Sequence, residues 1–192
     1  MNHFFLILTL LLSPLVSYAG GTPKTDAEFA RLPVYCRVKM HNSSTPAEKK
    51  VWRKKLGHGY LHLHHYCYAL NFLNHSHQID KKKANRDALK AALKEIGYVQ
   101  RHTSKQFALQ PEMTYKKGVI YERLGDYSSA MKEYLKGIAI NPRIPAFYAA
   151  LSDLYKKNGD EGEAKNVLKR GLKYKPKSKM LNKRLKKLKN QT

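Results

Sequence analysis

Helical spacing of apolar positions is the main pattern along this 192-residue chain. Residues 60–74 are apolar on nearly every side, which is typical of a helix buried on several faces. We expect this helix to form the centre of the N-terminal half. Residues 85–103 are amphipathic and predict a second helix that packs antiparallel to it. A last amphipathic helix is expected over residues 179–189, with Ser178 as its N-cap and three leucines in one stripe.

Local signals predict shorter elements before residue 60. Thr45, Pro46 and Glu48 have the spacing of an N-cap, a first helical proline and a capping box. A helix should therefore begin at residue 46 and run through Leu56, then bend near the glycines that follow. Residues 27–31 have room for one helical turn, and residues 32–36 are expected to be extended because of Pro33.

Residues 111–142 recur 34 positions later as residues 145–176. Small residues repeat where two helices must approach closely, a Gly-Asp pair marks the turn between the helices, and a proline follows the second one. The aligned pairs are Gly118 and Ser152, Tyr121 and Tyr155, Gly125 and Gly159, Asp126 and Asp160, Ala130 and Ala164, Gly137 and Gly171, and Pro142 and Pro176.

This unit resembles the tetratricopeptide repeat, a helix–turn–helix whose apolar face is buried only by stacking. The resemblance implies an all-α fold in which two helical hairpins, 111–144 and 145–178, stack as a short right-handed solenoid. The helices are expected near 112–124, 127–140, 146–158 and 161–174, and the C-terminal capping helix completes a region 111–192. Such a scaffold carries no chemistry of its own, so neither an enzyme nor a cofactor is expected.

Residues 20–110 are expected to form a helical cap, a degenerate repeat rich in cysteine and histidine. This region resembles an N-terminal block of exported bacterial tetratricopeptide proteins, which implies one integrated domain and no catalytic residue. The residues that carry the resemblance are Leu32-Pro33, Tyr35-Cys36, Trp52 and His64-His65-Tyr66-Cys67. Because the chain has only two cysteines, Cys36 and Cys67, export would favour one disulfide between them.

Residues 1–19 resemble a secretory signal. The apolar stretch 4–12 is too short to span a bilayer, Pro14 follows it, and residues 17–19 place small side chains where signal peptidase reads them. We expect cleavage after Ala19 and a periplasmic location in a Gram-negative envelope. The alternative is an uncleaved N-terminal anchor.

The charge balance indicates an anionic partner. The chain has 37 Lys and Arg against 14 Asp and Glu, a formal net charge of +23. Because export argues against nucleic acid, we expect an acidic protein segment, or else an anionic envelope surface. The pattern makes no prediction of oligomeric state.

In this repeat family the ligand lies in a groove formed by the first helix of each pair. When the groove positions of the family are transferred to this chain by register, the resemblance implies an interaction scaffold that binds an acidic segment of another protein. The positions expected to contact the partner are Tyr115, Lys116, Val119, Arg123, Asp153, Lys156, Lys157, Lys183 and Arg184, and the same register adds Glu112, Glu122, Ala146, Ala149 and Ala150.

Two alternatives come from other features. His58, His62 and His65 have the i, i+4, i+7 spacing that would place three imidazoles on one helix face, which would suit a metal- or haem-handling protein. Against this, no Asp or Glu lies between Glu48 and Asp80 to complete a site, so structural histidines are favoured. The other alternative is that the basic helix 179–189 binds anionic lipid.

Overall fold

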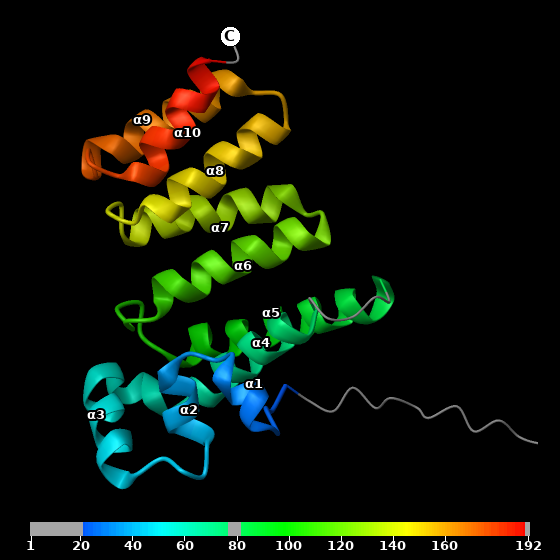
Figure 1. The fold of residues 1–192 in the computed structure, drawn as a ribbon, viewed down its shortest axis with the longest axis vertical. Helices are drawn as coiled ribbons and strands as arrows, with labels where there is room; N and C mark the ends of the chain where they lie inside the picture. The colour runs from blue at the N-terminus through cyan, green and yellow to red at the C-terminus, as the bar shows by residue number, and fades with distance from the viewer. Residues whose placement is uncertain (1–20, 77–81, 191–192) are drawn as a thin grey trace, which may run out of the picture.

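The computed structural model describes residues 21–76 and 82–190, so the expected signal segment lies outside the described residues. Every regular element in the described part is a helix, and the helices stack along one long axis (Figure 1). They are α1 (Asp26–Ala30), α2 (Val34–Met40), α3 (Pro46–Leu56), the 3-10 helix η1 (Gly57–Leu61), α4 (Leu63–Ser76), α5 (Lys82–His102), α6 (Gln110–Leu124), α7 (Tyr127–Ile140), α8 (Pro145–Lys157), α9 (Glu161–Tyr174) and α10 (Lys179–Lys189). No helix in these residues is both long and apolar enough to cross a membrane.

The repeat helices follow the sequence pattern closely. The helices α7, α9 and α10 have the predicted bounds, and α6 and α8 begin one or two residues earlier than expected. Gly125 and Gly159 end α6 and α8 with φ of 83° and 81°, a left-handed conformation that glycine adopts without steric cost. The aspartate after each glycine then caps the next helix by accepting a backbone N–H.

The small residues of the repeat lie at helix contacts. A Cβ atom added to Gly118 of α6 would lie 2.3 Å from the ring of Tyr134 on α7, so only glycine allows the ring to pack there. Ala130 of α7 is fully buried. Gly118 therefore faces the second helix of its own repeat, as the register predicts.

Two predictions for the N-terminal region are wrong. Residues 34–40 form the helix α2, because Pro33 restricts the residue before it and stands outside the helix as its N-cap. The predicted helix over 60–74 is divided: Tyr60 and Leu61 belong to η1, and α4 begins at Leu63. Two glycines define the preceding turn: Gly57, with a φ of 56°, ends α3, and a Cβ on Gly59 would lie 2.3 Å from the Phe107 ring.

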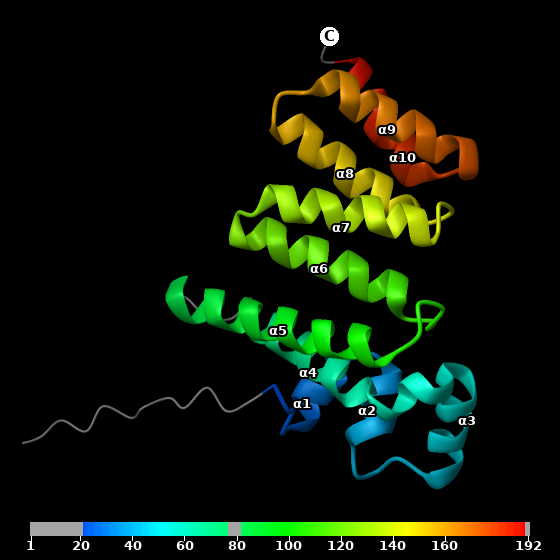
Figure 2. The ribbon, with the colours of Figure 1, turned by 180° about the vertical axis from the view of Figure 1, so that it is seen from behind.

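The described chain has two hydrophobic cores that meet at α6. The first lies among α2, α4 and α5 and includes Met113 and Ile120 from α6. The second fills the space among α7, α8, α9 and α10, and Tyr115 and Tyr121 of α6 pack against it. Seen from behind, α4 and α5 form an antiparallel pair beneath α6 (Figure 2). The N-terminal region thus packs directly on the first repeat.

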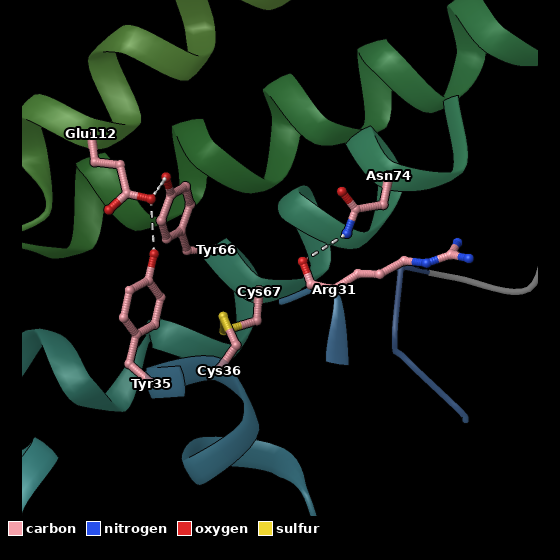
Figure 3. Close-up of a disulfide and its surroundings, with 7 residues drawn as sticks. All are labelled: Arg31, Tyr35, Cys36, Tyr66, Cys67, Asn74 and Glu112. Carbon is pink, nitrogen blue, oxygen red and sulfur yellow. Dashed lines mark hydrogen bonds between the residues drawn. A yellow bond between two sulfur atoms is a disulfide. The ribbon is translucent and has the colours of Figure 1, made fainter. Parts of the chain in front are cut away.

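The expected disulfide between Cys36 and Cys67 is present and fully buried (Figure 3). The residue before each cysteine is a buried tyrosine, Tyr35 on α2 and Tyr66 on α4. Both tyrosine hydroxyls donate to Oε1 of Glu112 on α6, each at 2.9 Å. Burial, together with the Glu112 carboxylate, raises the pKa of both tyrosines. Glu112 therefore joins the N-terminal region to the first repeat, and does not stand free in a groove.

Candidate functional site

A hollow of about 310 Å³ lies between α6, α8 and α10, where the register places the groove. Aromatic and aliphatic side chains line it together with two acidic and two basic residues, so its formal charge is zero. The lining residues are Tyr115, Val119, Glu122, Arg123, Tyr134, Ala146, Ala149, Ala150, Asp153, Met180 and Arg184.

Tyr115 is held firmly in the wall of this hollow. Its ring is half-buried, with its centroid 5.8 Å from those of Tyr134 and Phe147. The Tyr134 hydroxyl donates to the Glu122 carboxylate. Burial raises the pKa of Tyr115, and the nearby Glu122 carboxylate adds to the effect. The wall is therefore a pre-ordered aromatic surface that loses little side-chain entropy on binding.

A second hollow, also of about 310 Å³, continues along α8 and α10. Three lysines line it, and Asp153 is the only acidic residue among its lining. The lining residues are Ser152, Asp153, Lys156, Lys183, Arg184, Lys187 and Leu188. The charge of this hollow is positive.

Asp153 and Arg184 belong to both hollows and mark the boundary between them. The Arg184 guanidinium donates to both carboxylate oxygens of Asp153, with N–O distances of 2.9 and 3.1 Å. These hydrogen bonds raise the pKa of Arg184. The two side chains are 54% and 37% exposed, so the pair adds little stability. One formally neutral hollow with aromatic walls and one basic hollow therefore meet at an exposed ion pair.

The structure brings most of the predicted groove residues together. Two lysines are exceptions, because Lys116 and Lys157 line neither hollow. The Lys157 ammonium lies 4.1 Å from the centroid of the Tyr127 ring and donates to the hydroxyl of that tyrosine at 2.5 Å. The predicted residues that do line the hollows are Tyr115, Val119, Arg123, Asp153, Lys156, Lys183 and Arg184.

The sequence reading missed Met180 and Lys187, which also line the hollows. Together with Lys183 and Arg184 they have the spacing i, i+3, i+4, i+7 on α10 and so share one helix face. This helical periodicity in the sequence is the signal that could have identified Met180 and Lys187.

The three candidate metal-binding histidines do not share one helix face. His58 lies in η1, His62 caps the end of η1, and His65 lies in α4. The ring of His65 is engaged by Glu95, with 2.6 Å between Nδ1 and the carboxylate. Within residues 21–76 and 82–190, no three His, Cys, Asp or Glu side chains converge as a three-ligand metal centre requires.

Residues 111–144 and 145–178 each match the tetratricopeptide repeat family. A comparison with curated proteins gave no match. Among solved structures, the chain is similar to the crystal structure of MamA, with 22% sequence identity and a TM-score of 0.44, over 68% of this chain and 67% of that one. The family matches coincide with the helix pairs α6–α7 and α8–α9, and residues 111–178 are therefore two tetratricopeptide repeats.

Proposed function

We propose that this protein is a non-catalytic interaction scaffold that binds an extended segment of another protein along α6, α8 and α10. Tetratricopeptide repeats generally bind other proteins, which supports this class of function. The observation that carries the proposal is the pair of adjoining hollows, one formally neutral with aromatic walls and one basic, that share Asp153 and Arg184.

The two hollows favour a partner segment with two different halves. An aliphatic or aromatic side chain fits beside Tyr115, where a rigid ring provides a desolvated anchor. Acidic side chains fit the second hollow, beside Lys156, Lys183 and Lys187. The lysines would raise the association rate and make it depend on salt, whereas the apolar anchor would slow dissociation.

We propose further that the protein is exported and works in the periplasm. A buried disulfide is typical of proteins that fold in an oxidising compartment, and residues 1–19 have the pattern of a secretory signal. Protein isolated from the periplasm should begin at Gly20 when its N-terminus is sequenced. A chain that retains residues 1–19 there would support the uncleaved anchor instead.

The groove is tested by reversing two charges that line it. In the variant Lys156→Glu/Lys183→Glu both changes fall in the second hollow. The matched control Lys169→Glu/Lys173→Glu changes the net charge equally on exposed positions of α9. Each protein is immobilised and exposed to envelope extract at low and at high salt, and the captured proteins are quantified.

The groove variant should lose the partners that wild type captures at low salt, while the control keeps them. Circular dichroism should show equal helix content in all three proteins. Equal capture by the groove variant and the control would refute the groove as the binding site. Loss of capture by both would indicate an effect of net charge alone.

A further inference from the structure

A pair of imidazoles lies outside the groove, where the end of α5 meets η1. His62 caps η1, and His102 is the last residue of α5. Their ring centroids are 5.2 Å apart, and the ring centroid of His58 lies 6.0 Å from that of His62. His58 and His102 are exposed, so the pair is open to solvent.

One nitrogen of His102 has a fixed role. Its Nδ1 lies 2.8 Å from the backbone carbonyl oxygen of Tyr98. A carbonyl only accepts, so Nδ1 carries the proton and Nε2 keeps its lone pair. The Tyr98 ring stacks on His102 with 4.0 Å between centroids, which holds the orientation of the imidazole. Metal-binding histidines are commonly oriented in this way, by donating the other ring N–H to a carbonyl or a carboxylate.

The ring of Tyr98 also contacts His62. His62 is half-buried at the end of η1, and its ring centroid lies 5.7 Å from that of Tyr98. Tyr98 therefore packs against both imidazoles of the pair.

We propose that His62 and His102 form a two-imidazole site for a divalent transition-metal ion, with water completing the coordination. Two imidazoles bound at about 2.0–2.1 Å to one tetrahedral ion have ring centres about 5 Å apart, which agrees with the observed spacing. Imidazole ligands suit copper, nickel and zinc, and copper(II) binds most tightly in this series.

The other nearby histidines have different positions relative to this pair. The Nδ1 of His65 is engaged by Glu95, and its ring packs against Tyr98 with 3.9 Å between centroids, so His65 lies on the side of Tyr98 and is not part of the proposed pair. His58 is exposed, and its ring centroid lies 6.0 Å from that of His62. The proposed site uses His62 and His102 alone.

The test is a titration of purified full-length protein with copper(II), followed by calorimetry and by electron paramagnetic resonance. Wild type should bind one ion at this site, with two coordinated nitrogens in the spectrum and a higher melting temperature when the ion is bound. His62→Ala and His102→Ala should each weaken that binding at least about tenfold. The melting temperature of each metal-free variant checks that the fold is intact.

His41→Ala is the matched control. Both ring nitrogens of His41 are already engaged, Nδ1 with Ser43 and Nε2 with Asp26, so this variant should bind copper as wild type does. Copper held at the chain's amino terminus would be insensitive to all three substitutions. Affinity unchanged in both His62→Ala and His102→Ala, or no saturable site in wild type, would overturn the proposal.

Discussion

Replacing Glu112 with alanine should weaken the joint between the N-terminal region and the first repeat. Glu112 lies at the start of α6, and its Oε1 accepts hydrogen bonds from Tyr35 and Tyr66, which flank the disulfide on α2 and α4 (Figure 3). The ring of Tyr66 is fully buried and that of Tyr35 is 8% exposed. Neither hydroxyl would find water as a substitute acceptor without some local opening of the structure.

The magnitude follows from the two hydroxyls left without an acceptor. An unsatisfied buried donor costs about 1–3 kcal/mol, so Glu112→Ala should lower the free energy of unfolding by about 2–4 kcal/mol. Tyr66→Phe alone should cost about 1–2 kcal/mol, because Glu112 keeps its bond from Tyr35. In the Glu112→Ala background, Tyr66→Phe removes a hydroxyl that is already unpaired, and should be neutral or stabilising.

Urea unfolding of the four proteins in this double-mutant cycle measures the coupling directly. We expect a coupling energy between Glu112 and Tyr66 of about 1–3 kcal/mol, the difference between the cost of Tyr66→Phe in wild type and its neutral or stabilising effect in Glu112→Ala. Tyr174→Phe is the control, since Tyr174 is 49% exposed and its loss of a hydroxyl should change stability by less than about 0.5 kcal/mol. A coupling energy below about 0.5 kcal/mol would refute the view that this carboxylate joins the two regions.

Three further outcomes are expected. The double variant Cys36→Ala/Cys67→Ala should lose about 3–4 kcal/mol of stability in urea unfolding. Alkylation of unreduced wild type should detect no thiol, and free thiols would exclude the bond. Ala130→Leu should lose about 1–3 kcal/mol by overpacking a fully buried position, and an unchanged melting temperature would show that Ala130 is not at the helix contact. Burial raises the pKa of Tyr66 and Tyr134 above that of tyrosine in the unfolded chain. The free energy of unfolding should therefore be constant up to about pH 10, where unfolded tyrosines begin to ionise, and should fall at higher pH. A free energy of unfolding that does not fall above about pH 10 would contradict these shifts.

The repeats were predictable because their determinants are local and periodic. Glycine or alanine at a fixed spacing marks a helix contact, and Gly-Asp combines a left-handed turn with an N-cap, so α7 and α9 could be bounded from the sequence. The start of α2 was missed for a physical reason. Pro33 disfavours helix in the residue before it but is well tolerated just outside a helix N-terminus, so Val34 is free to begin one.

The candidate site was less predictable, because its details depend on contacts between residues far apart in the sequence. Register alone assigns Glu112 and Lys157 to the groove, yet tyrosines outside their own helices engage both side chains. His102 lies 40 residues after His62, and no spacing rule brings the two rings together. Pairings of this kind follow from how α5 packs against η1 and α4, which is a property of the folded chain.

The ion pair between the two hollows gives the proposed groove a means of favouring acidic partners. Asp153 holds Arg184 in a bidentate geometry, but both side chains are substantially exposed, and such pairs contribute about 0.2–1 kcal/mol. A partner's carboxylate would therefore displace Asp153 at little cost and gain a guanidinium already oriented for two hydrogen bonds. A neutral segment would gain nothing there and would leave the ion pair intact. Under the proposed function, the groove would select acidic residues because the Asp153–Arg184 pair is weak enough to be displaced yet keeps Arg184 in position.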